Sequence, residues 1–475
     1  MERVRNALKP RRQSPAYEPL DDGSGEDPRR DGRKGRFSWL EYSIFLLLGV
    51  SMLWAWNMFL AASPYFQHRF ANSPRLLSAY SPSLLSVSSV TNLVAMLILT
   101  HLQSNANYPN RIIWSLLINI VTFTLLAIST VAFRSVSEGF YFFFLMSMVF
   151  LASLAAAFCQ NGVFAYVSGF GEGAYTQAIM TGQGVAGVLP CIAQIISVLS
   201  MPSKTTKRGD GDVAQDGKMG TAPPVAQESG KSAFAYFLTA TLITVAALLA
   251  FIYLLRRHPD AGTGSAATTT PKSPMADSSD DEPPLSTRDE PTSRKTVGMW
   301  ALYKKLHWLA NAVFLTFAIT MFFPVFTQQI HSTYPQDSQP RLLQPSCFIP
   351  LAFLFWNTGD LAGRLVTLLP SFSRFTAFPR TMFAASILRV VWIPLYLLCN
   401  THGDGAVIPS DFFYLVIVQL LFGLTNGFLG SICMMGASAE GTGIEPDERE
   451  AAGGFMGLML IGGLTVGSLA SFGVA

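Results

Sequence analysis

Two residues of opposite charge lie in the middle of an apolar stretch, 348–370. Each residue of an α-helix turns the chain by about 100°. Phe353, Asn357, Asp360 and Arg364, at successive spacings of four, three and four residues, therefore fall into one narrow stripe. A charged side chain at the centre of a bilayer costs at least about 2.5 kcal/mol, so charges there usually face a water-filled cavity or a partner.

The stripe predicts one of two things. Asp360 and Arg364 can form a solute site in which two charges and an amide face a cavity. They stand four residues apart, so they can also pair on one helix face and hold helices together without binding anything.

The distribution of charge identifies the class of protein. Of the 475 residues, 50% are hydrophobic and only 13% are charged, which is about half the charged share of a soluble domain. No Asp, Glu, Lys or Arg occurs in 139–171, 173–203 or 232–255. Each of these runs is long enough to cross a bilayer as a helix, so the sequence predicts an all-α polytopic membrane protein.

Eleven apolar runs are long enough to be transmembrane helices: 39–62, 83–102, 112–133, 140–168, 174–199, 232–255, 307–330, 347–370, 380–400, 411–435 and 451–472. Two polar stretches, 201–231 and 258–300, have the composition of flexible linkers. We expect a disordered cytoplasmic tail at 1–37, a bundle of six spans at 38–257 with a polar loop at 201–231, a disordered cytoplasmic linker at 258–300 and a bundle of five spans at 301–475.

The Lys and Arg residues indicate the orientation in the membrane. With the N-terminus in the cytoplasm, 22 of the 33 lie in cytoplasmic segments and nine on the opposite side, while Arg364 and Arg389 lie within spans. Because cytoplasmic loops carry the excess of positive charge, we expect a cytoplasmic N-terminus.

A second motif, at 182–187, has the form G-x-G-x-x-G. Such a motif binds a dinucleotide only in a strand–turn–helix unit, whereas here it is embedded in an apolar span. We expect its glycines to allow close helix packing. We also expect the five cysteines to be small buried side chains and not disulfides or metal ligands.

No residue pattern indicates an enzyme. The six histidines lie in loops or near span ends without metal-ligand spacing, and no phosphate-binding P-loop is present. We therefore expect no catalytic residue, no cofactor, no metal site, no nucleic-acid partner and no obligate protein partner. The default function is a carrier in the lipid bilayer that uses a solute gradient.

Several motifs resemble those of the equilibrative nucleoside transporter family, most closely its fungal, vacuolar-type members. They are AWN at 55–57, TGQGVAG at 181–187, FFP at 322–324, WNTGDLAGR at 356–364, Arg389 with WIPLYLLCN at 392–400, TNGFLGS at 425–431 and EREAAGGFMG at 448–457. Eleven spans with a long linker after the sixth also look like that family.

The resemblance implies a major-facilitator-like pair of helix bundles around one central site that opens alternately to each side. Matching the motifs implies substrate-binding roles for nine residues: Trp56, Leu60, Gln160, Phe323, Phe353, Asn357, Asp360, Arg364 and Leu464. In this interpretation Phe353 and Asn357 bind the base, and Asp360 and Arg364 bind the ribose hydroxyls.

We therefore predict a carrier that moves nucleosides such as adenosine or uridine down their gradient. A broader form of the prediction adds nucleobases to its substrates. The residues alone leave two alternatives open. One is a carrier of another small polar solute, such as a sugar or an amino acid, including one coupled to protons through Asp360. The other is a receptor or scaffold that transports nothing. The resemblance implies the vacuolar or another intracellular membrane rather than the plasma membrane.

Overall fold

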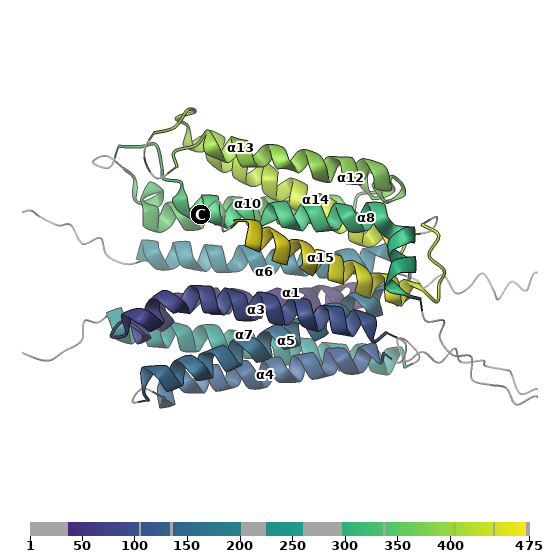
Figure 1. The fold of residues 1–475 in the computed structure, drawn as a ribbon, viewed down its shortest axis with the longest axis horizontal. Coiled ribbons are helices and arrows are strands. Elements are labelled where there is room, and N and C mark those ends of the chain that lie inside the picture. Colours follow the sequence, from purple (N-terminus) through teal and green to yellow (C-terminus); the bar gives the residue numbers. More distant parts are fainter. Residues whose placement is uncertain are drawn as a thin grey trace, which may run out of the picture. The chain divides into compact units, whose positions relative to one another are not determined.

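The computed structural model describes residues 37–103, 106–133, 136–200, 225–259, 297–335, 339–401, 403, 405–439 and 442–471. Within these residues the secondary structure is almost entirely helical (Figure 1). The predicted tail at 1–37, apart from Phe37, and most of the predicted linker at 258–300 lie outside the described residues.

Six long helices match the first six predicted spans: α1 (Trp39–Ala61), α3 (Pro74–His101), α4 (Tyr108–Ala132), α5 (Glu138–Gly169), α6 (Gly173–Ser200) and α7 (Val225–Arg257). A short helix, α2 (Ser63–Arg69), follows α1. Helix α3 begins nine residues before the predicted span because Pro74 at its first position is preorganised for a helix start. Helix α7 begins inside the stretch predicted as a polar loop, at 201–231, so that residues 225–231 are helical.

The second half contains α8 (Met299–Thr320), α9 (Phe322–Gln329), α10 (Pro345–Val366), α12 (Pro379–Leu388), α13 (Trp392–Leu397), α14 (Leu421–Gly436) and α15 (Arg449–Ser471). The shorter elements are η4 (Arg341–Leu343), α11 (Pro370–Ser373), η5 (Arg374–Ala377), η6 (Arg389–Val391) and η7 (Phe413–Leu420). The ninth span is broken, because the 3-10 turn η6 separates α12 from α13, just before Pro394, which has no N–H for the helix ladder. The tenth span begins as the π-helix η7.

Ten of the eleven predicted spans are helices long and apolar enough to cross a membrane. The eleventh, α10, is 22 residues long but is less apolar, because its stripe places an amide and two charges in the segment. The prediction of an all-α polytopic membrane protein is confirmed, and the span that carries the stripe is the one that deviates from an ordinary apolar helix.

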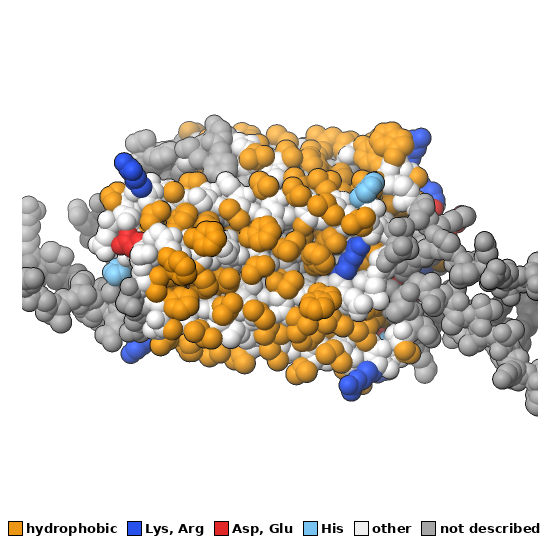
Figure 2. Space-filling model, turned by 60° about the horizontal axis from the view of Figure 1, so that its bottom comes forward, with side chains coloured by type: hydrophobic (Ala, Val, Ile, Leu, Met, Phe, Trp, Pro, Cys, Tyr) orange, Lys and Arg blue, Asp and Glu red, His pale blue; other side chains and the backbone are white. Residues whose placement is uncertain are grey.

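Large hydrophobic side chains cover the outside of the helices. Figure 2 shows them across the middle of one face, with charged side chains near its two ends. Trp114, Phe143, Leu242 and Leu249 are each more than half exposed. Apolar patches of this extent are rare on soluble monomers, and lipid is the environment that suits them.

The middle of the helix array is formed by α6, α10 and α15, with α4, α5 and α7 at one margin and α12 and α13 at the other (Figure 1). Helix α10 packs against α6 and α14, and α15 packs against α5 and α8. The described residues from Trp39 onward form one compact unit, and one core cluster includes Phe45, Phe164, Phe317 and Met456 from both halves of the chain. The division into two bundles at the linker stays a prediction.

Helices α10 and α14 approach so closely that only glycine fits at their contact. A Cβ atom on Gly363 would lie against the carbonyl oxygen of Leu424, and one on Gly427 against the carbonyl oxygen of Asp360. Both distances would be well under the 3.0 Å that real Cβ atoms keep. These glycines therefore bring the backbone of α14 next to the charged part of α10, as small residues do in membrane helix pairs.

We expect Gly427→Ala to destabilise the folded protein by about 1–3 kcal/mol, because the added methyl group forces the two backbones apart. The measurement is the thermal unfolding midpoint of the detergent-solubilised protein. The matched control is Gly139→Ala in α5, where an added Cβ meets no atom within 4 Å. Equal midpoints for the two variants would contradict the close contact.

Candidate solute-binding site

Helix α10 carries the stripe and is delimited by prolines. Pro345 occupies its first turn, where a missing N–H costs nothing, and Pro370 follows its end at Val366. Asp360 and Arg364 are 3% and 5% exposed. Both charges therefore lie inside the protein, where each needs a partner.

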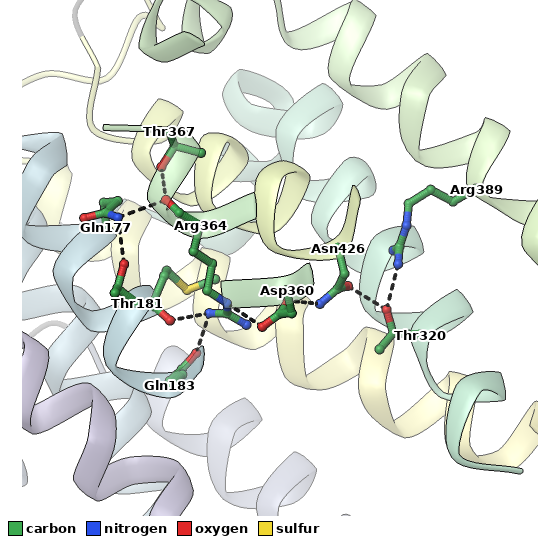
Figure 3. A network of polar contacts seen from close by, with 10 residues as sticks. Gln177, Thr181, Gln183, Thr320, Asp360, Arg364, Thr367, Arg389 and Asn426 are labelled. Atoms are coloured by element: carbon green, nitrogen blue, oxygen red, sulfur yellow. Dashed lines mark hydrogen bonds and ion pairs between the residues drawn. The ribbon is translucent and has the colours of Figure 1, made fainter. Parts of the chain in front are cut away.

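Both carboxylate oxygens of Asp360 accept hydrogen bonds from protein groups (Figure 3). Arg364 Nε donates to Oδ2 at 2.7 Å, and Asn426 Nδ2 from α14 donates to Oδ1 at 2.7 Å. A buried carboxylate with two donors of this quality has its loss of hydration compensated. The predicted pair is thus formed, and in this state it is bonded to the protein.

The guanidinium of Arg364 also reaches a second helix. Its Nη1 donates to the carbonyl oxygen of Met180 at 2.6 Å and to Gln183 Oε1 at 3.4 Å, both on α6. Gln177 of α6 in turn donates to the carbonyl oxygen of Arg364 at 2.9 Å. Arg364 therefore links a helix from the first half of the chain to one from the second. Its Nη2 makes no hydrogen bond with any described residue, which leaves donors for a solute.

The glycines of the 181–187 motif make this approach possible. A Cβ atom on Gly184 would lie 3.1 Å from Leu361 and 3.2 Å from the Arg364 side chain. One on Gly187 would collide with Asn357 Oδ1, and one on Gly182 with α1. The predicted role of these glycines in close helix packing is confirmed, and no room remains for a dinucleotide.

An aromatic cluster adjoins the stripe. The ring of Phe323 on α9 stacks on Trp356 with centroids 4.2 Å apart and planes 10° apart, and it meets Phe353 edge-on at 5.0 Å. The sequence analysis missed Trp356, which lies outside the narrow stripe. Its Nε1 is buried and has no hydrogen-bond partner among the described residues. A tryptophan away from the ends of a span was the available signal, because this residue normally anchors at the interface.

Two asparagines approach α6 from either side. Asn357 Nδ2 donates to the carbonyl oxygen of Phe353 at 2.8 Å and lies 3.6 Å from Cys191 Sγ on α6. Asn57 Nδ2 on α1 donates to the carbonyl oxygen of Ala186 at 2.7 Å. The amide that follows Trp56 in the sequence thus belongs to the same region as the α10 stripe.

The other predicted residues are more scattered. Trp56 and Leu464 are partly buried, and Leu60 is 48% exposed. Gln160 has a buried Oε1 that finds no hydrogen-bond partner in the described part of the chain. Among the described residues, no hydrogen bond or ring contact joins Trp56 or Gln160 to the stripe. The structure therefore brings together Phe323, Phe353, Asn357, Asp360 and Arg364, and leaves the roles of Trp56, Leu60, Gln160 and Leu464 as predictions.

Sequence reasoning also missed the groups behind Asp360. Asn426 appeared in the sequence as a polar residue of the tenth span, with nothing to indicate its partner. Its Oδ1 accepts from Thr320 Oγ1 of α8 at 2.6 Å, and Thr320 accepts from Arg389 Nη2 at 3.2 Å. These contacts extend the network across three further spans (Figure 3).

The candidate metal ligands are dispersed. No group of three or more His, Cys, Asp or Glu side chains placed to hold a metal ion occurs in the part of the chain that the structure describes. The five cysteines, Cys159, Cys191, Cys347, Cys399 and Cys433, are buried and unbridged, as predicted.

Solved structures with a similar fold are major facilitator transporters. The fucose:proton symporter of E. coli in the outward conformation aligns with a TM-score of 0.51 and 14% identity over 91% of this chain and 92% of that one. The human organic anion transporter MFSD10 aligns with a TM-score of 0.51 and 13% identity, with coverages of 91% and 92%. The predicted major-facilitator-like fold is confirmed.

Sequence relatives identify the family. A family model described as "Nucleoside transporter" matches residues 145–475. The "Nucleoside transporter FUN26" of Saccharomyces cerevisiae is 30% identical over 495 residues, which cover 97% of this chain and 87% of that protein. The "Equilibrative nucleoside transporter 1" of Rattus norvegicus is 27% identical, with coverages of 90% and 95%. The chain belongs to the nucleoside transporter family, which confirms the predicted nucleoside carrier.

We expect Arg364→Ala to destabilise the protein by about 3–5 kcal/mol, because it leaves the buried Asp360 charge uncompensated. The double variant Asp360→Asn, Arg364→Gln removes both charges and keeps hydrogen-bonding groups at both positions, so it should unfold close to the wild-type temperature. Thermal unfolding of the solubilised proteins measures both effects. Equal losses for the single and double variants would show that charge pairing is not what stabilises this contact.

Proposed function

We propose that the chain is a facilitative carrier that moves nucleosides such as adenosine or uridine down their gradient, with the α10 stripe at its solute site. The observation that carries the proposal is the pair Asp360–Arg364, which is buried where α6 meets α10. Phe353 lies further along the same stripe, and the ring of Phe323 on α9 meets it edge-on. A polar end and an aromatic end on one helix face suit a solute with a ribose and a flat base.

Each group in the stripe has a role that fits its chemistry. Phe353 packs against the base, since aromatic rings favour stacked or edge-on contacts with other rings. Asn357 offers an amide to the edge of the base. Asp360 accepts a hydrogen bond from a ribose hydroxyl, and the Nη2 donors of Arg364 bind a hydroxyl oxygen.

The remaining four predicted residues form the opposite wall in this proposal. Trp56, Leu60 and Leu464 supply apolar surface, and Gln160 supplies a hydrogen-bonding amide. The support for them is the match to family motifs, together with the unpartnered Gln160 Oε1, which fits an amino group on a base.

The contacts between α6 and α10 support a two-state transport cycle. Arg364 bonds to Met180 in the first half of α6, whereas beyond Cys191 the helix exposes Ile192 and Leu199. We propose that the first contact closes one end of the site in this state. Ribose hydroxyls replace part of the hydrogen bonding of Arg364, so that the contact with α6 can open without leaving a bare charge.

The proton-coupled alternative has less support. Protonation of Asp360 would displace one of the two hydrogen bonds that its oxygens accept, from Arg364 and from Asn426. Both oxygens of the Asp360 carboxylate are therefore already engaged as acceptors. A carrier driven by the solute gradient alone needs no proton site.

We expect the purified protein in liposomes to take up labelled adenosine or uridine with saturation and to exclude glucose. An imposed pH gradient should leave the initial rate unchanged. The variant Asp360→Asn, Arg364→Gln should insert and unfold normally but lose nucleoside uptake, because the ribose contacts need both charges. Wild-type liposomes without nucleoside uptake would overturn the proposed function, and full activity of the double variant would make the pair purely structural.

We also propose that the N-terminus is cytoplasmic, which the excess of Lys and Arg in the predicted cytoplasmic segments supports. We place the carrier in the vacuolar or another intracellular membrane on the resemblance to fungal, vacuolar-type transporters. In isolated intact vacuoles, added protease should remove an N-terminal epitope tag. A tag inserted in the 201–231 loop should be protected. The reverse pattern would contradict the orientation, and a tag found only at the cell surface would contradict the location.

A further inference from the structure

Arg389 is a buried arginine whose hydrogen-bond partners among the described residues are all neutral. It is 2% exposed and lies in η6, where the ninth span is broken. Its guanidinium donates to the carbonyl oxygen of Thr316 at 2.5 Å, to Thr320 Oγ1 at 3.2 Å and to Thr425 Oγ1 at 3.3 Å, and it lies 4.7 Å from the ring centroid of Phe422. No ion pair within the described residues includes Arg389. A charge within a membrane span is costly and usually functional.

The hydrogen bonds from Arg389 run in one direction. Arg389 Nη2 can only donate to Thr320 Oγ1, and the Thr320 hydroxyl, at 2.6 Å from Asn426 Oδ1, donates onward. Asn426 then presents its NH₂ group to Asp360 Oδ1 at 2.7 Å. In each of these three hydrogen bonds the donor therefore lies on the Arg389 side and the acceptor on the Asp360 side. Figure 3 shows the four residues and the contacts between them.

The direction of the chain sets the orientation of one amide. Thr320 Oγ1 also lies 2.8 Å from the carbonyl oxygen of Thr316, so its single proton has an alternative acceptor. The charge of Arg389, which donates to both Thr316 and Thr320, favours the hydroxyl turned to Asn426, because the carbonyl of Thr316 is already engaged. Without it the Thr320 hydroxyl can turn to Thr316, and the Asn426 amide then loses one of the two contacts that hold its NH₂ group toward Asp360. A flipped amide would place oxygen against carboxylate oxygen.

We infer that Arg389 is a positioning residue for Asp360, acting through Thr320 and Asn426, and that it thereby sets the affinity for solutes with ribose hydroxyls. The inference rests on the proposed function, in which Asp360 accepts a hydrogen bond from such a hydroxyl. Arg389 itself touches no solute in this arrangement. Its effect is confined to how the carboxylate of Asp360 is held.

The chain offers a matched pair of variants for the test. Thr320 and Thr425 both accept a hydrogen bond from Arg389, but only Thr320 passes one on to Asn426. Thr320→Val and Thr425→Val therefore each remove one hydroxyl that accepts from Arg389. Only Thr320→Val also interrupts the series of hydrogen bonds that leads to Asp360. Arg389→Gln and Arg389→Lys are added, with the lysine variant as the conservative rescue.

The measurement is the KM and maximal rate of liposome uptake for uridine and for 2′,3′-dideoxyuridine, which lacks the 2′- and 3′-hydroxyls that we assign to Asp360 and Arg364. We expect Thr320→Val and Arg389→Gln to raise the KM for uridine about tenfold. We expect the KM for dideoxyuridine to change less than about twofold, since no hydroxyl of that solute depends on Asp360. Thr425→Val should leave both values near wild type, and Arg389→Lys should recover part of the uridine affinity.

Equal losses for the two nucleosides, or equal effects of the two threonine variants, would overturn the inference and make Arg389 a structural residue. If Arg389→Gln fails to fold, the comparison of Thr320→Val with Thr425→Val decides alone. Wild-type protein without uridine uptake would overturn the proposed function instead, and this inference with it.

Discussion

The burial of one carboxylate, that of Asp360, constrains the rest of the site. A buried charge must keep its partners within hydrogen-bond distance, and here they come from the next turn of α10 and from α14. Gly427 allows α14 to come that close, and Gly184 does the same for α6 at Arg364. The close helix contacts at these glycines are therefore required if the buried Asp360–Arg364 pair is to keep its hydrogen-bond partners.

A structural ion pair and a solute site are not mutually exclusive here. Arg364 holds α6 and α10 together through the carbonyl oxygen of Met180, and the same guanidinium faces the proposed position of the ribose. A carrier needs contacts between its moving parts that are strong without solute and exchangeable with solute. The hydrogen bond from Arg364 to a backbone carbonyl meets that need, because the hydroxyl oxygens of a ribose can accept from the same guanidinium in its place.

The sequence predicted what depends on local spacing. The interval of four residues indicated the Asp360–Arg364 pair, and the absence of charge over long runs indicated the spans. It could not indicate partners that only tertiary structure brings together, such as Asn426, which is 66 residues from Asp360, and Thr320, which is 106 residues from Asn426. The place of Trp356 in the site was not predicted, because helix periodicity puts this residue off the stripe. Its stacking on Phe323 depends on the position of α9, which is a matter of tertiary structure.

The low hydropathy of α10 bears on how the protein is made. A charge at the centre of a span disfavours insertion by about 2.5–3.5 kcal/mol, and α10 carries two. During synthesis α6 precedes α10, so the acceptors for Arg364 already exist when α10 leaves the ribosome. Asn426 follows later, on α14. Helix α10 is therefore synthesised before one of the two hydrogen-bond donors of Asp360 exists, and we expect changes in α14 that remove this amide to lower the yield of correctly inserted protein.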